Sequence, residues 1–225
     1  MTPIVATRFL AAALAVVLAG CAGTPPPPDW QLNAQGAIER AQDAYLSGQG
    51  RIEELEFARA RAEIARTGRA DLLARAELVR CATRVASLVF EPCTGFDAWQ
   101  ADAAPAEQAY ARYLQAQATA PDAGLLPPQH RSMLAPAAGG AQLAAVQEPL
   151  SRLVAAGVLL RGNRADPQTI TLAIDAASSQ GWRRPLLAWL GVQAQRAEQA
   201  GDADALARIR RRMQLVGGEA PARRP

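Results

Sequence analysis

The chain has 225 residues, 24 basic and 21 acidic side chains, and a formal net charge of +3 at pH 7. This near-neutral balance argues against a nucleic-acid-binding protein, which normally presents a concentrated basic surface. Apart from one histidine, every basic side chain is an arginine, and alanine dominates the apolar residues. Ala, Leu, Arg, Glu and Gln all have good helix propensity, so the composition favours an all-α fold.

The N-terminal segment is typical of an export signal. Residues 9–20 form an uncharged apolar run that is too short to cross a membrane, because a spanning helix needs about 20 apolar residues. The run ends in Leu18-Ala19-Gly20-Cys21, which resembles the lipobox of bacterial lipoproteins. The resemblance implies that residues 1–20 are a signal peptide and that the thiol of Cys21 is lipidated after cleavage. The alternative is an ordinary signal peptide that is cut near Ala22.

The same resemblance implies a location. Several acyl chains on Cys21 would hold the protein on a membrane without any spanning helix. In the Gram-negative pattern, Ala22 in place of an aspartate implies the outer membrane, with the protein facing the periplasm. Pro25 to Pro28 favour an extended polyproline spacer of about 3 Å per residue. We therefore expect residues 21–29 to be a tether between the lipid and the folded domain.

Helical spacing of apolar residues predicts four helices in the first half of the domain, residues 30–118. Apolar stripes run from Ala34 to Tyr45, from Ile52 to Ala65, from Leu72 to Val89 and from Ala106 to Gln117. In the third stripe, apolar residues cover most of the helix circumference. We expect that helix to be the most buried one.

Two cysteines remain after Cys21. In an exported protein, the even pair of Cys81 and Cys93 predicts a disulfide, with two free buried thiols as the alternative. A continuous helix would hold their Cα atoms about 18 Å apart, whereas a disulfide needs about 5.5 Å. The third helix must therefore end before Cys93, and Glu91-Pro92 is a suitable stop.

The second half, residues 141–217, follows a connector. Residues 119–140 contain four prolines and paired glycines, with room for one short helix at Gln129–Leu134. Further helices are expected around Leu150–Val158, after the Asp166-Pro167 start, over Pro185–Ala200 and over Asp202–Val216. We expect residues 218–225 to form a disordered tail.

An internal similarity suggests how the helices pack. GRADLLAR at 68–75 and GDADALAR at 201–208 agree at six of eight positions. Helical hairpins of this length are similar to the tetratricopeptide class. With Gly48 at the turn, Phe57 and Ala60 match the second-helix positions of that repeat, whereas the Trp, Leu-Gly and Tyr positions of its first helix are not matched. The resemblance covers about two hairpins. It implies antiparallel hairpins packed in series, as in an α-solenoid, with an irregular helical bundle as the alternative.

The sequence holds few groups suited to catalysis. His130 is the single histidine and lies in the proline-rich connector, where we expect it to face solvent. The acidic group of Glu53, Glu54 and Glu56 is interpreted as a solvated helix start, because acids favour that end of a helix. No phosphate-binding loop, nucleophile motif or metal-ligand spacing occurs, so no cofactor and no metal are expected.

Two surface features suggest contacts with partners. On the last predicted helix, the basic side chains of Arg208, Arg211 and Arg212 lie opposite its apolar stripe. They could meet anionic lipid headgroups, peptidoglycan or an acidic protein, or they could simply form a solvated face. Aromatic residues are scarce, so each of four is expected to anchor the core or, as the alternative, to contact a partner. These residues are Tyr110, Tyr113, Trp182 and Trp189.

These observations predict an outer-membrane-anchored periplasmic lipoprotein whose helical domain is a binding scaffold or an accessory subunit of an envelope protein complex. That functional step rests on analogy with other helical-repeat lipoproteins. The alternatives are a cell-wall-modifying enzyme and a structural envelope protein without a dedicated partner. The identity of the envelope partner does not follow from the sequence.

Overall fold

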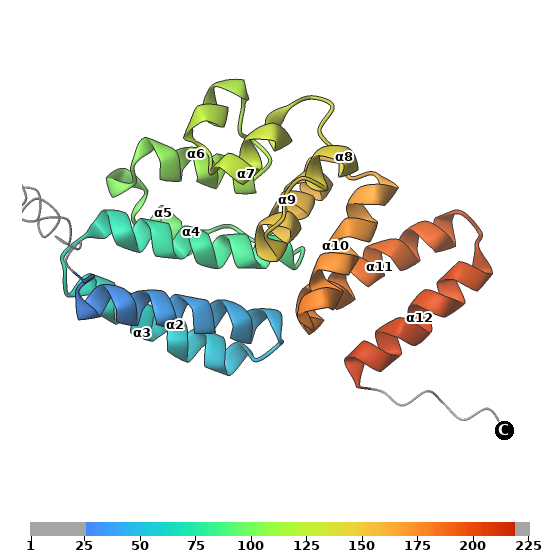
Figure 1. Cartoon of the computed structure of the whole chain (residues 1–225), viewed down its shortest axis with the longest axis horizontal. Helices are drawn as coiled ribbons and strands as arrows, with labels where there is room; N and C mark the ends of the chain where they lie inside the picture. The colour runs from blue at the N-terminus through green and yellow to red at the C-terminus, as the bar shows by residue number, and fades with distance from the viewer. Residues whose placement is uncertain (1–25, 219–225) are drawn as a thin grey trace, which may run out of the picture.

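A computed structural model describes residues 26–218, and the secondary structure of this part of the chain consists of helices without strands (Figure 1). The lipobox, its Cys21 and residues 219–225 of the predicted tail lie outside the described residues. The eight longer helices are α2 (Asp29–Leu46), α3 (Gly50–Ala65), α4 (Ala70–Ala86), α6 (Pro105–Leu114), α9 (Pro149–Arg161), α10 (Pro167–Gln180), α11 (Arg183–Gln199) and α12 (Ala203–Gly217). None of the described helices is long and apolar enough to cross a membrane.

The helices pack in series, as the sequence predicted. α2 and α3 form an antiparallel hairpin beside α4, and α11 and α12 form another at the opposite end (Figure 1). Short turns join consecutive helices in both regions. A glycine lies at each of these turns in the left-handed conformation, which costs glycine little free energy. These glycines are Gly48, Gly68, Gly181 and Gly201, with φ angles of 86°, 66°, 68° and 70°.

Shorter elements fill the chain between α4 and α9. They are α5 (Thr94–Asp97), η2 (Gln100–Asp102), η3 (Ala120–Leu125), α7 (Pro128–Arg131), η4 (Ser132–Leu134) and α8 (Gly140–Leu143). Residues 119–140 thus contain two 3₁₀ turns and one short α-helix. Leu126 and Met133 in this stretch are buried, so it contributes to the core as well as joining the two halves.

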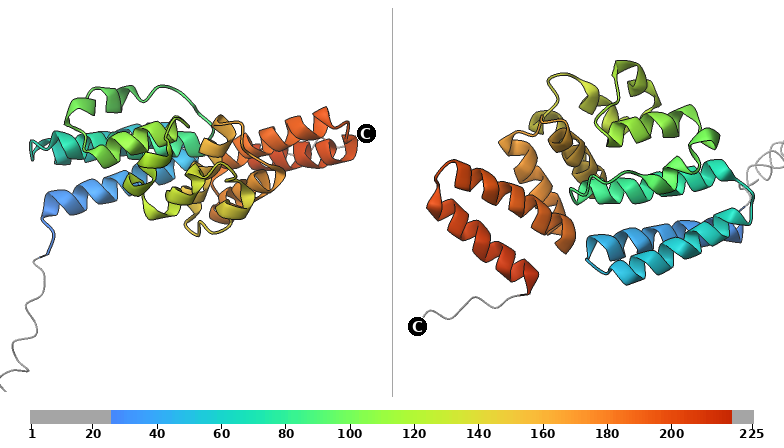
Figure 2. Two further views of the ribbon diagram at one scale, coloured as in Figure 1. Left: turned by 90° about the horizontal axis from the view of Figure 1, so that it is seen from above. Right: turned by 180° about the vertical axis from the view of Figure 1, so that it is seen from behind.

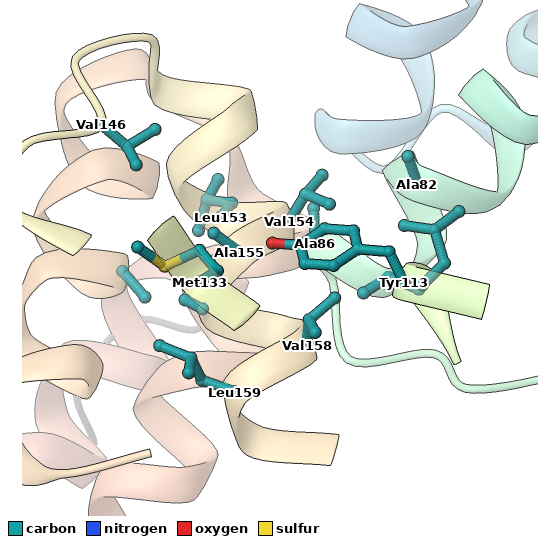
Figure 3. Packing of buried hydrophobic residues seen from close by; sticks show 14 of the residues in the cluster. Ala82, Ala86, Tyr113, Met133, Val146, Leu153, Val154, Ala155, Val158 and Leu159 are labelled. Atoms are coloured by element: carbon teal, nitrogen blue, oxygen red, sulfur yellow. The ribbon is translucent and has the colours of Figure 1, made fainter. Parts of the chain in front are cut away.

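The apolar residues form two clusters that share α4. The larger cluster joins α4 and α6 to α9, α10 and α11, and Figure 3 shows part of it around Tyr113, Met133 and Leu159. The smaller cluster lies between α2, α3 and the other face of α4. This explains why the third apolar stripe covers most of its helix. All buried residues of both clusters lie between Ala34 and Ile209, so a chain that begins at residue 26 contains the whole described core.

The two halves of the domain are in direct contact. Gly157 on α9 lets that helix approach α4 closely, because a Cβ there would lie 2.9 Å from Val85 Cγ1 and would also clash with the Val85 carbonyl oxygen. Trp189 on α11 is fully buried, and its Nε1 donates to the Ala86 carbonyl oxygen at 3.1 Å. Residues about 100 positions apart therefore pack as one unit.

The acidic group on α3 is not a solvated helix start, contrary to the sequence interpretation. Glu53 and Glu56 are buried, and Glu54 alone is exposed. Arg80 donates to Glu53 from Nε at 2.7 Å, and Arg59 donates to Glu56 at 2.6 Å. The arginines reach in from the surface, so the carboxylates are paired within the protein rather than hydrated.

The predicted disulfide between Cys81 and Cys93 is confirmed. Their Cα atoms lie 6.0 Å apart, which is within the usual range for a disulfide. As the geometric argument required, α4 ends at Ala86, and the chain returns past Pro92 to begin α5 at Thr94. The bridge fixes this return segment to the middle of α4.

Candidate binding groove

The first part of the candidate site is a hollow between α2 and α4. It has a volume of about 580 Å³. Its apolar lining includes Trp30 and Ile38 from α2 and Leu72 from α4, and none of these three side chains is fully buried. Glutamines at 31, 35 and 42 of α2 also line it. Glutamine amides can both donate and accept hydrogen bonds, so they suit a ligand that carries peptide groups.

A second hollow lies on the α6 side of α4. Its volume is about 460 Å³, and its walls come from α4, α6 and the chain around α7. Tyr110, Leu125 and Pro127 supply apolar surface, while Arg75 and Arg131 supply charge. Leu125 is 43% exposed, which leaves its apolar side chain available for contact.

A third hollow, of about 330 Å³, lies between α4, α7 and the start of α9. His130 lies in its wall, and Gln129, Glu148 and Ser151 contribute further polar groups. Glu148 caps α9, because its carboxylate oxygens accept from the backbone N–H of Leu150 at 2.8 Å and of Ser151 at 2.5 Å. Its two oxygens therefore already have hydrogen-bond donors from its own helix.

The three hollows adjoin one another along α4, because they share lining residues. Val79, halfway along α4, lines all three. Gln42 lines the first and third hollows, while Tyr110 and Pro127 line the second and third. Seen from above, α2 and the segment around α7 and α8 project to the same side of α4 (Figure 2, left). We call this concave surface, with Val79 at its centre, the α4 groove.

A buried carboxylate lies at the edge of the α4 groove. Glu107 on α6 is 8% exposed and lines the second hollow. Its Oε1 accepts from Arg75 Nε at 2.8 Å and from Nη2 at 2.6 Å, which holds the Arg75 guanidinium beside the groove. Oε2 has no hydrogen-bond partner among the described residues. The pair places one positive and one negative group next to apolar surface.

His130 is buried, contrary to the expectation that it faces solvent. It is 2% exposed, and its ring packs at a tilt against those of Tyr110 and Tyr113, with centroid distances of 5.8 and 5.0 Å. The Tyr113 hydroxyl and His130 Nδ1 form a hydrogen bond of 3.2 Å. Burial disfavours the charged imidazolium and lowers the pKa of His130 to about 4, whereas the nearby Glu148 carboxylate opposes this shift. The imidazole is therefore neutral at pH 7.

The other sequence-predicted residues lie elsewhere. Arg208, Arg211 and Arg212 are exposed on α12, and none of them lines the α4 groove. Trp189 and Tyr113 are fully buried anchors, as expected, while Trp182 and Tyr110 are half-buried. Cys81 and Cys93 line a separate hollow of about 220 Å³ behind α4. The described residues contain no group of three or more His, Cys, Asp or Glu side chains placed to hold a metal ion.

Sequence reasoning missed the groove itself. Leu72 and Val79 both lie in the apolar stripe of residues 72–89, which predicts a buried helix and does not show which of its positions stay open. The available signal was an excess of apolar positions on α4, since a helix that is apolar nearly all round needs cover on every side. The chain matches no protein-family model, no curated protein and no solved structure, so the function has to be inferred from the groove and its residues.

Proposed function

We propose that the α4 groove binds a polypeptide segment of a partner in the bacterial envelope, and that the protein is a scaffold or accessory subunit of an envelope complex. The observation that carries this proposal is the meeting of three hollows at Val79, which gives an extended apolar floor with polar edges. Ligand sites of this kind combine apolar walls with a few polar groups that fix orientation. An extended groove suits a segment of chain better than a compact small molecule.

The cellular location belongs to the same proposal. The lipobox resemblance of Leu18-Ala19-Gly20-Cys21 supports an outer-membrane lipoprotein that faces the periplasm. The disulfide between Cys81 and Cys93 supports an oxidising compartment outside the cytoplasm. We expect a fatty-acid analogue fed to cells to label the wild type and not the Cys21→Ser variant. Equal labelling of the two proteins would reject the anchor.

A cell-wall-modifying enzyme is the competing function. The third hollow does gather a histidine, a serine and a glutamate, which are the residue types of a hydrolytic triad. However, Nδ1 of His130 is bonded to the Tyr113 hydroxyl, and both oxygens of Glu148 cap α9. Among the described residues, no carboxylate is therefore in place to orient the imidazole. These contacts favour the binding function over the hydrolase.

Photocrosslinking in intact cells tests the binding function. A photoreactive residue would replace Gln42 or Gln129, which line the third hollow together with Val79 and come from α2 and α7. Leu55 on α3 is the matched control, because it is 54% exposed and lies outside the groove. We expect the same partner peptide to be attached from Gln42 and Gln129 and to be absent from Leu55. Attachment at all three positions, or at none, would contradict the proposal.

A further inference from the structure

The helix α12 carries a second surface that the groove does not include. Arg208, Arg211, Arg212 and Leu215 are all exposed. At 100° per residue, these four side chains fall in one sector of the helix about 100° wide, to one side of the buried Ile209. We call this surface the α12 flank. Leu215 is 75% exposed, more than any other large apolar side chain of the described residues.

The arginines of the α12 flank are not needed to satisfy groups within the protein. None of the three forms an ion pair or a hydrogen bond with another described residue, whereas the neighbouring Arg210 lies 3.4 Å from Glu198. By contrast, Arg80 and Arg75 neutralise buried carboxylates. The guanidinium groups of the flank are therefore free to meet an external anion.

Positive charge is concentrated at this end of the molecule. Residues 183–217 contain seven arginines and three acidic residues, a net charge of +4, whereas the whole chain carries +3. The remainder of the chain is thus slightly acidic. The α11–α12 hairpin lies at one end of the helical series, where α12 packs on α11 and leaves its outer side uncovered (Figure 1). A large flat surface could therefore reach the α12 flank.

We propose that the α12 flank binds the anionic headgroup surface of a phospholipid membrane. The guanidinium groups would contact lipid phosphates, and Leu215 would enter the boundary between headgroups and acyl chains. An acidic protein is a less suitable partner, because a single leucine among three arginines would need a matching apolar pocket on that protein. A lipid surface offers acyl chains beside phosphates at every position. This proposal does not depend on the groove.

Vesicle sedimentation tests the proposal with a chain that begins at residue 26, so that no lipid anchor contributes. The vesicles contain phosphatidylcholine either alone or mixed with phosphatidylglycerol. We expect binding to the anionic vesicles only, and a loss of binding when salt is raised. Because each basic residue near an anionic surface strengthens binding about fivefold, replacing Arg208, Arg211 and Arg212 with glutamine should weaken it about 100-fold.

A second triple variant controls for net charge. Arg51, Arg66 and Arg69 are exposed and lie far along the chain from α12, so their replacement with glutamine removes the same charge elsewhere. We expect this control to lose no more than half as much binding free energy as the flank variant loses. Equal weakening by the two triple variants, or equal binding to neutral and anionic vesicles, would overturn the proposal.

The Leu215→Ser variant separates a membrane from an acidic polymer, because it leaves the charge unchanged. We expect about a tenfold loss of vesicle binding, since the apolar contact is removed. Unchanged binding of this variant would reject insertion at the membrane surface, as would equally tight binding of the wild type to a polyglutamate peptide. Thermal unfolding followed by circular dichroism confirms that each variant is folded before it is compared.

Discussion

At the scale of single residues, His130 is a buried, neutral imidazole that packs against the rings of Tyr110 and Tyr113. The unfolded chain protonates this group at its ordinary pKa of 6.5, whereas the folded protein does so only near pH 4. Between these values the unfolded state binds more protons. Stability must therefore fall as the pH drops from about 6.5 to about 4, and it is fully present above that window.

The variant His130→Phe should remove this dependence. We expect the free energy of unfolding of the wild type to fall by about 2 kcal/mol from pH 7 to pH 5 because of His130. The variant should lack that decrease, although it loses about 1 kcal/mol at pH 7 with the Tyr113 hydrogen bond. Urea unfolding at the two pH values measures both quantities.

The comparison has to be made between the two proteins at each pH. Glu77 titrates in the opposite sense, because burial raises the pKa of its carboxyl group. Its effect is common to the wild type and the variant and cancels in the difference. Identical pH profiles for the two proteins would show that His130 is not the buried neutral group described here.

Residue-level burial was the least predictable property of this chain. Glu53 lies near the start of a helix, where acidic side chains are usually hydrated. Its carboxylate is instead paired with Arg80 and Arg84 from α4. His130 is flanked by prolines, yet Tyr113 and α9 cover it. In both cases the partners lie 17 or more positions away, so local pattern carries no information about them.

At the scale of helices, the sequence was more informative. Apolar periodicity placed α2 and α3, which each bury one face, and α4, whose apolar residues cover most of its circumference. Pro167 lies in the first turn of α10, as the Asp166-Pro167 start predicts. The crossing of α4 and α9 could not be predicted in this way. It depends on the absence of a side chain at Gly157, which helix propensity alone would count as a defect.

The Gly157→Ala variant tests that crossing. Alanine improves helix propensity by about 1 kcal/mol, but the added methyl group would press on Val85. We expect overpacking to prevail, with a net loss of about 2 kcal/mol in unfolding free energy. Gly191→Ala on α11 is the matched control, because a Cβ there meets nothing within 4 Å, and it should stabilise the protein by about 0.5–1 kcal/mol. If both variants are stabilised, α4 and α9 do not pack as described.

The disulfide makes a second prediction at this scale. Cys81 and Cys93 are 12 positions apart, and closing a loop of this length stabilises the folded state by about 3 kcal/mol. We expect the Cys81→Ser, Cys93→Ser double variant to lose about that amount in denaturant unfolding. Reductant should lower the stability of the wild type to the same level and leave the variant unchanged. Two thiols open to alkylation in the unreduced wild type would instead show that the bridge is absent.

At the scale of the whole molecule, α4 is the common element. It packs against α2 and α3 on one side and against α6 and α9 on the other, and the uncovered strip between these contacts forms the floor of the groove. A helical series was predictable from the stripes and the glycine stops. The groove was not, because its walls come from residues between 30 and 154 that only the three-dimensional packing brings together.

The most direct test of the binding function is the affinity of the crosslinked partner segment for a variant with a blocked groove floor. Val79→Arg places a charged side chain where all three hollows meet, and Leu55→Arg adds the same charge on the exposed side of α3. Isothermal titration gives Kd for both variants and for the wild type. We expect Val79→Arg to bind the segment at least tenfold more weakly and Leu55→Arg to bind as the wild type does, because only the first variant obstructs the apolar floor. Wild-type affinity in a folded Val79→Arg protein would contradict the α4 groove as the binding site.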